Sequence, residues 1–163
     1  MKIEAQDNAE FTRIGTLIEH FSVAMLTSID GDGALISRPM SPLKMDANCA
    51  VWLFTDVRSA KVEQLRVINL TFSDPQRAIY VSLSGHGEIY AEHGDARNLW
   101  TSFAESWFPD GPDSSSLALL KLVPDAADYW DATHRKMVRV LGMASCVVSA
   151  EPIAMTTTAV AQS

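Results

Sequence analysis

The most informative segment of the sequence is Val51-Trp52-Leu53-Phe54-Thr55-Asp56-Val57-Arg58-Ser59-Ala60-Lys61. Its first four residues are β-formers in an unbroken apolar run, which is typical of a strand buried on both faces. Thr55 and Asp56 favour a turn, and from Ser59 the apolar residues recur at helical spacing up to about Val67. The segment therefore predicts a buried strand, a turn and a helix in direct succession.

The junction between this strand and helix has the chemistry of an anion site. Ser59 suits the N-cap position, and the junction brings free N–H groups, two hydroxyls and Lys61 toward one point. A helix N-terminus carries partial positive charge and the lysine adds a full charge, so this point would suit a phosphate group. The alternative is an ordinary capped helix with a surface lysine, and the segment alone leaves both readings open.

Composition and charge narrow the class of protein. The chain has 163 residues, of which 47% are hydrophobic and 20% charged, so we expect one globular domain with a real core. The net charge of −7 argues against nucleic acid and anionic membranes as partners. We find no charged-then-apolar leader and no apolar run long enough to span a bilayer. Cys49 and Cys146 match no CxxC pattern, so free thiols and a cytoplasmic location are expected.

The first third of the chain predicts a helix followed by a hairpin. Ala9 to His20 carries the apolar stripe of an amphipathic helix. Ser22 to Ile29 reads as a strand, and an Asp-Gly-Asp-Gly turn leads into a second strand, 34–38. Two prolines then end this second strand, which puts Arg38 at its exit, where a cation could meet a ligand.

The remainder of the chain predicts further strands with a few helices. Strands are expected at 69–73, 78–90 and 117–123, with a β extension over 127–130, and helices at 95–103 and 136–148. Gly85 and Gly87 indicate a bulge or a close approach to the backbone. Such a pattern is mainly β with α additions and favours an antiparallel barrel flanked by helices. We expect one domain over 1–149 and a flexible tail over 150–163.

Several familiar catalytic patterns are absent or weak. Ser82-Leu83-Ser84-Gly85 lacks the leading glycine of a nucleophile elbow, and Gly85-His86-Gly87 lacks the rest of a dinucleotide fingerprint. The four histidines show no metal-ligand spacing, so no metal site is expected. The acidic residues recurring at every third position over 125–131 favour a solvated face over paired-carboxylate catalysis. Trp107 and Phe108 suit either an anchor in a subunit interface or a lid over a flat ring.

Four segments together resemble a known family. They are Ser37-Arg38-Pro39-Met40, Phe54-Thr55-Asp56-Val57-Arg58-Ser59-Ala60-Lys61, Val81-Ser82-Leu83-Ser84-Gly85-His86-Gly87-Glu88 and Trp107-Phe108-Pro109-Asp110-Gly111. The chain is similar, from about Phe11 to Val148, to the general stress protein 26 group of the pyridoxamine 5′-phosphate oxidase-like superfamily. The resemblance implies an FMN-binding split β-barrel with antiparallel, Greek-key-like strands.

The resemblance also implies a binding site and an assembly. It implies that the FMN phosphate is held by Arg38, Ser59 and Lys61. It places Phe54 and Thr55 along the flavin with Met40 close by, and it implies a homodimer with flavin sites between the subunits, in which Trp107 would come from the partner chain. These roles agree with the anion site expected at the junction of strand and helix, because a dianionic phosphate needs converging cationic and N–H donors.

Two departures from true pyridoxamine 5′-phosphate oxidases concern the substrate. A lysine that those enzymes place after the phosphate arginine would fall on Leu43, with Lys44 one position late. Their Arg-Leu-x-Pro ending is replaced by an Ala/Thr-rich sequence. We therefore expect the FMN site without the vitamin-oxidising activity.

The function expected from the sequence is that of a stress-related flavoprotein. We expect an FMN-dependent oxidoreductase of unassigned substrate, with no assigned catalytic residue, because the flavin would carry the redox chemistry. The alternative is a non-catalytic flavin-binding protein that stores or senses flavin. A third reading replaces FMN with FAD, F420 or haem.

Overall fold

The computed structural model describes residues 1–58, 62–91, 96–143 and 149–153. Within these residues ten strands form one sheet, whose main path runs β1-β4-β5-β8-β7-β6-β2-β3, with β9 paired to β8 and β10 to β9. The strands are β1 (Lys2–Ile3), β2 (Ala24–Ile29), β3 (Leu35–Met40), β4 (Pro42–Met45), β5 (Val51–Asp56), β6 (Ile68–Asp74), β7 (Ile79–Tyr90), β8 (Leu117–Asp131), β9 (Lys136–Leu141) and β10 (Ser149–Ile153). The pair β1–β4 is parallel, and the other strand pairs among the described residues are antiparallel.

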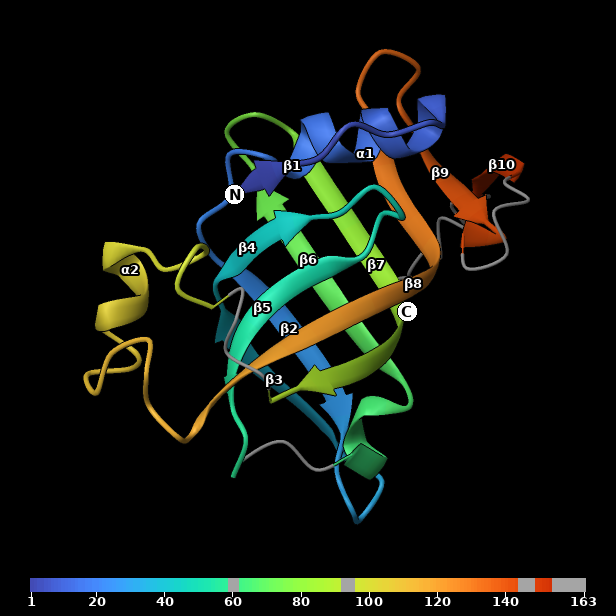
Figure 1. The fold of residues 1–163 in the computed structure, drawn as a ribbon. Coiled ribbons are helices and arrows are strands. Elements are labelled where there is room, and N and C mark those ends of the chain that lie inside the picture. The colour runs from blue at the N-terminus through green and yellow to red at the C-terminus, as the bar shows by residue number, and fades with distance from the viewer. Residues whose placement is uncertain (59–61, 92–95, 144–148, 154–163) are drawn as a thin grey trace.

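The sheet curls into a half-barrel with little helix around it (Figure 1). The helix α1 (Ala9–Ile18) lies across one end of the sheet, and its first turn is capped by Asn8, whose side chain accepts from Glu10 N and Phe11 N. The helix α2 (Ser102–Glu105) stands to one side. This architecture confirms the expected mainly β, mostly antiparallel barrel with helical additions. No helix in the described ranges is long and apolar enough to cross a membrane.

The core consists of two apolar clusters separated by β5 and β8. The larger cluster fills the inside of the curled sheet and includes Leu53 of β5 and the buried face of α1. The smaller cluster lies on the other side of the same strands and includes Phe54 and Leu119. Because successive residues of a strand point to opposite faces, β5 has apolar residues on both, as its sequence predicts.

The hairpin of β2 and β3 is confirmed, with Leu26 opposite Arg38. The turn is stabilised by Asp30, whose Oδ1 accepts hydrogen bonds from Asp32 N at 2.9 Å and Ala34 N at 2.8 Å. The predicted end of the second strand was too early, because β3 continues through Pro39 to Met40. Proline is tolerated there because β3 ends the main strand path and is an edge strand.

The expected irregularity at the glycines of β7 is also confirmed. The register between β7 and β8 shifts between Ser84 and Gly85. A Cβ atom on Gly85 would lie 1.9 Å from the carbonyl oxygen of Val123. The backbone of β8 therefore approaches β7 more closely than any other residue type would permit.

Three predicted helices were wrong in extent or in kind. The helix expected after β5 reduces, within the described residues, to the 3₁₀ helix η1 (Val62–Leu65), because β6 starts as early as Ile68. The helix expected at 95–103 is replaced by turns that lead into the short α2. Of the helix expected at 136–148, residues 136–141 form the strand β9 instead, whose buried residues Val138 and Val140 follow the two-residue period of a strand, and residues 144–148 lie outside the described part of the chain.

The sheet extends past the expected end of the domain. Residues 149–153 form β10 and pair with β9, Ala150 lying opposite Val140. Backbone pairing thus orders residues whose side chains are mostly exposed. Residues 154–163 lie outside the described part of the chain, and the division into a domain and a tail stays a prediction.

Candidate functional site

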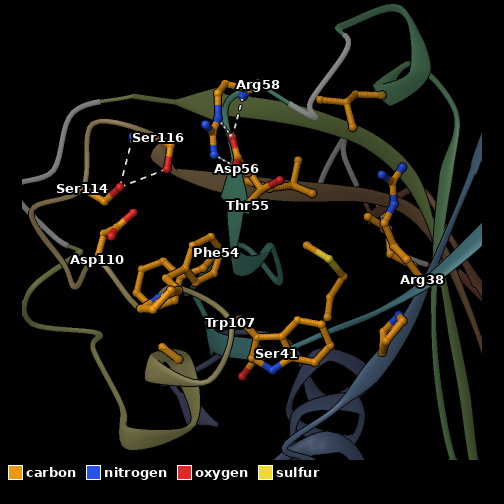
Figure 2. Close-up of a pocket in the computed structure, with 18 of the residues that line it drawn as sticks. Arg38, Ser41, Phe54, Thr55, Asp56, Arg58, Trp107, Asp110, Ser114 and Ser116 are labelled. Carbon is orange, nitrogen blue, oxygen red and sulfur yellow. Dashed lines mark hydrogen bonds and ion pairs between the residues drawn. The ribbon is translucent and has the colours of Figure 1, made fainter.

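A pocket of about 440 Å³ lies where β5 ends (Figure 2). It is lined by β3 and its exit (38–41), β5 and its exit (54–56 and 58), η1 (64 and 65), the loop after α2 (107–110) and the turn before β8 (114 and 116), with single residues from β2, α2 and β8. A volume of this size is typical of small-molecule sites, roughly 300–1,000 Å³. The fold therefore brings segments that are far apart in sequence to one cavity.

Five of the seven residues expected to hold a flavin line this pocket. They are Arg38, Met40, Phe54, Thr55 and Trp107. The other two, Ser59 and Lys61, lie outside the described residues.

Arg38 brings a cation to one side of the pocket. Its Nη2 donates a hydrogen bond to Ser28 Oγ on the neighbouring strand β2 at 2.9 Å. Its Nε is buried and has no hydrogen-bond partner among the described residues. A buried donor without a partner costs about 1–3 kcal/mol, so this guanidinium keeps unused hydrogen-bonding capacity beside the pocket.

The middle of the pocket is apolar and aromatic. Phe54 is buried and held in place by Trp100, with ring centroids 5.5 Å apart, and by Phe108, at 6.0 Å. Trp107 lies in the same cavity and remains 49% exposed. A flat apolar body would find contacts on these rings. Trp107 of this same chain lines the pocket, and a contribution of the partner chain's Trp107 to the site stays a prediction.

An ion pair at the end of β5 was missed by the sequence analysis. Arg58 donates to Asp56 from Nε at 3.1 Å, from Nη2 at 2.7 Å and from its backbone N at 2.8 Å. The side-chain hydrogen bond from Arg58 lowers the pKa of Asp56, and the same bond raises the pKa of Arg58. Asp56 therefore stays ionised near neutral pH and is a poor proton donor. The Asp-x-Arg spacing was the available signal.

A second polar group closes the pocket on the side away from Arg38. Ser114 Oγ and Ser116 Oγ lie 2.9 Å apart and hydrogen-bond to each other. Asp110 stands on the same side, and Figure 2 shows these three opposite Arg38, with Phe54 and Trp107 between. These serines could not be identified from the sequence, because a Ser-rich turn before a strand carries no distinctive pattern.

The described lining contains few groups for acid–base chemistry. Its ionisable residues are Arg38, Asp56, Arg58 and Asp110, and it includes no His, Cys, Lys or Tyr. Among the described residues no group of His, Cys, Asp and Glu side chains is placed to hold a metal ion. This part of the pocket is equipped to bind and orient a ligand rather than to move protons.

The two substrate-side departures noted in the sequence have clear positions. Leu43 is buried in the smaller core cluster. Lys44 faces Glu4, with Nζ 3.6 Å from Oε1, and lies over the ring of Trp52 at 5.1 Å. The register between β4 and β5 shifts between Pro42 and Lys44, but this irregularity does not bring Leu43 or Lys44 into the lining of the pocket.

Comparison with known proteins gives a family and several structural relatives. A family model described as "Pyridoxamine 5′-phosphate oxidase like" matches residues 9–153. No curated protein matches the chain.

Three similar solved structures illustrate the relationship. A Clostridium acetobutylicum protein related to general stress protein 26 of Bacillus subtilis shares 25% identity over 80% of this chain and 93% of its own, with a TM-score of 0.67. A general stress FMN/FAD binding protein from Xanthomonas citri shares 26% identity over 72% of this chain and 85% of its own, with a TM-score of 0.58. A pyridoxamine 5′-phosphate oxidase-related, FMN binding protein from Nostoc punctiforme shares the fold at 13% identity, over 91% of this chain and 98% of its own, with a TM-score of 0.71.

Proposed function

This chain belongs to the pyridoxamine 5′-phosphate oxidase-like family, as the resemblance of its sequence predicts, and from that premise we propose that it binds FMN in the pocket beside Arg38. The observation that carries the proposal is the buried Nε of Arg38, which has no partner in the described part of the chain and lies at one side of an aromatic pocket. A phosphate satisfies that donor, and a flat ring fills the space between Phe54 and Trp107. The names of two structural relatives, which include FMN binding and FMN/FAD binding, support a flavin.

The proposed phosphate site combines Arg38 with Ser59 and Lys61. Arg58 and Gln64 both line the pocket, and the segment that joins them contains Ser59 and Lys61. Chain connectivity therefore supports the assignment that the sequence predicts. FMN is proposed as the cofactor and FAD is the alternative, which chromatography of the flavin released on denaturation distinguishes.

The ring would be held by side chains already ordered by packing. Phe54 is fixed by its aromatic neighbours. Thr55 of β5 and Met40 of β3 line the same cavity. When bound, the flavin supplies electron and hydride transfer. The chain supplies orientation and an apolar surrounding, to which Phe54 and Trp107 contribute.

We propose a flavin-dependent oxidoreductase of unassigned substrate. The alternative is a non-catalytic flavin-binding protein for storage or sensing. The alternative is favoured by the absence of a residue suited to general acid–base work in the described lining and by the lowered pKa of Asp56. The oxidoreductase reading is favoured by the family. It requires a reaction in which the flavin needs no acid from the protein.

The absorption spectrum of the purified protein, followed by mixing with NADH or NADPH, tests both readings. We expect bound flavin absorbance that bleaches on mixing and recovers in air with continued turnover. A flavin spectrum that resists reduction by these and other donors supports the storage or sensing protein instead. A protein that binds no flavin at all contradicts both.

We further propose a homodimer. The outer face of the β2–β3 hairpin exposes Met25 at 41%, Ile29 at 39% and Leu35 at 74%, and Ile29 lies opposite Leu35. The hydrogen-bonded pair Thr27 and Ser37 lies between Met25 and the Ile29–Leu35 pair, and exposed apolar side chains grouped on one sheet face favour a subunit interface. Since β3 also carries Arg38 into the pocket, a partner covering this face would lie next to the flavin site.

The cytoplasmic location expected from the sequence is also a proposal. Cys49 is a free, buried cysteine. Burial, together with the nearby carboxylate of Asp46, raises the pKa of the Cys49 thiol to about 12. This thiol is therefore inert and needs no disulfide partner.

A further inference from the structure

The pocket has hydrogen-bonding groups at two opposite sides, and the phosphate proposal uses only one of them. Arg38 stands at one side, Ser114 and Ser116 at the other, and the rings of Phe54 and Trp107 lie between (Figure 2). Both serine side chains are half-buried. A ligand that fits this arrangement has an anion at one end, a flat apolar body, and a polar edge at the other end.

The two serines are held in a defined geometry. Ser114 Oγ and Ser116 Oγ are 2.9 Å apart, and Ser116 N donates to Ser114 Oγ at 3.3 Å. The turn is fixed to the end of β5 by a hydrogen bond from Val57 N to Ser116 O at 2.8 Å. Two pre-positioned hydroxyls offer both donors and acceptors, because each hydroxyl can donate once and accept twice.

We propose that Ser114 and Ser116 form a second polar subsite that hydrogen-bonds to the pyrimidine edge of the flavin ring, an inference that rests on the proposed FMN site. This edge presents carbonyl oxygens on either side of the N3–H group. One hydroxyl donates to a ring carbonyl and the other accepts from N3–H. The serine–serine bond is exchanged for these contacts, so no polar group is left unpaired.

The electrostatic setting suits a neutral polar edge. Arg58 is neutralised by Asp56 at 2.7 Å, and it also interacts electrostatically with Asp110, which lies on the same side of the pocket. The charged residues of this side are thus one guanidinium and two carboxylates, which leaves a net negative charge. A second phosphate would meet two carboxylates here, whereas ring carbonyls and an N–H group meet hydroxyls.

The test is a two-by-two titration of FMN and 3-methyl-FMN, in which N3–H is replaced by a methyl group, against the wild-type protein and Ser116→Ala. Binding is followed by quenching of flavin fluorescence. One net hydrogen bond contributes about 0.5–1.5 kcal/mol, so we expect the wild-type protein to prefer FMN by about threefold to tenfold. Ser116→Ala should reduce that preference toward unity.

Two controls separate this subsite from general disturbance. Ser115→Ala changes the exposed serine between the two and should leave both affinities unchanged, because Ser115 does not line the pocket. In 7,8-dichloro-FMN the opposite ring edge is altered, and Ser116→Ala should not change the preference between this analogue and FMN. If Ser116→Ala unfolds in a thermal melt, Ser114→Ala takes its place, and Ser116→Thr, which keeps a hydroxyl, should retain the preference for FMN.

The outcomes are distinct. Equal binding of FMN and 3-methyl-FMN by the wild-type protein, or equal effects of the Ser115 and Ser116 variants, overturns the subsite. In those cases a preference for FMN over riboflavin still upholds the proposed function. A protein that binds neither FMN nor riboflavin overturns both proposals.

Discussion

Arg38 and Ser28 are joined across β3 and β2 by a 2.9 Å hydrogen bond from Nη2 to Oγ. Ser28 is 1% exposed, so its hydroxyl fixes one edge of the guanidinium from within the sheet. Nε of the same guanidinium is buried without a partner among the described residues. One part of the cation is thereby anchored and another has no partner among the described residues, which supports the anion site proposed above.

The proposed dimer predicts a clear effect of charge on the hairpin face. Met25→Glu should convert the dimer to a monomer, because a carboxylate buried in an apolar interface loses its hydration. Phe103→Glu, on an exposed apolar residue of α2, should leave the dimer intact. Light scattering at micromolar concentration with FMN measures both. A wild-type protein that is monomeric with FMN bound would contradict the shared-site assembly.

The positions of Leu43 and Lys44 predict that pyridoxamine and pyridoxine 5′-phosphate are not oxidised at a useful rate. A second phosphate over the flavin needs its own cation, but Leu43 is buried in the core and Lys44 faces Glu4 and Trp52. The assay follows peroxide or pyridoxal phosphate formation by FMN-loaded protein. Lys44→Ala should leave FMN affinity unchanged. Turnover of about 1 s⁻¹ or above would show that other residues hold the substrate phosphate.

Asp131 predicts an acid-sensitive contribution to stability. Its carboxylate lies 2.7 Å from His134 Nδ1 and 3.4 Å from Arg13 Nη2. The hydrogen bond with His134 lowers the pKa of Asp131 below its ordinary 3.8. The contribution is therefore present above that ordinary pKa and is lost as the pH falls through the lower pKa of the folded state.

Asp131→Asn should lower the melting temperature at pH 7, and the difference from the wild-type protein should shrink as the pH falls below 3.8. Asp125→Asn changes an exposed carboxylate on the same strand and should have little effect at either pH. A difference for Asp131→Asn that grows toward low pH would refute the assignment.

Gly85 predicts a large loss of stability on gaining a single methyl group. Gly85→Ala would place Cβ 1.9 Å from Val123 O, which is backbone and cannot rotate away. We expect the free energy of unfolding to fall by about 3 kcal/mol, or the protein not to fold. Gly31→Ala has no atom within 4 Å of its new Cβ and should change stability by less than about 0.5 kcal/mol. Denaturant unfolding measures both, and similar values for the two variants would contradict the close approach of β7 and β8.

Local chemistry made some elements predictable from the sequence. The hairpin turn before β3 follows from an aspartate that can accept two backbone hydrogen bonds, and the bulge of β7 follows from glycines inside a β-rich run. That Arg38 lines the pocket was predictable from its position before Pro39, although β3 continues to Met40 and Arg38 therefore lies inside the strand, not at its exit.

Other elements depend on packing that a single segment does not reveal. In β9, Met137, Val140 and Leu141 match helical spacing, while Val138 and Val140 match a strand equally well. The strand is favoured over the helix by pairing with β8, because β5 pairs only with residues 117–122 of β8 and β9 pairs with residues 126–131. The turn that contains Ser114 and Ser116 is held beside the pocket by the hydrogen bond from Val57 N to Ser116 O. This bond joins segments that are distant in sequence.

The most direct test of the account is a titration of FMN and riboflavin into the wild-type protein, Arg38→Ala and Arg77→Ala. Arg77 is an exposed arginine paired with Asp74 in the β6–β7 turn, away from the pocket. A charge-assisted hydrogen bond contributes about 1.5–3 kcal/mol. We therefore predict that FMN binds the wild-type protein more tightly than riboflavin, and that Arg38→Ala weakens FMN by about 10- to 100-fold while riboflavin and the Arg77 variant change little. Equal affinities of the wild-type protein for the two flavins, or equal losses of both in Arg38→Ala, would contradict the phosphate site on which the account rests.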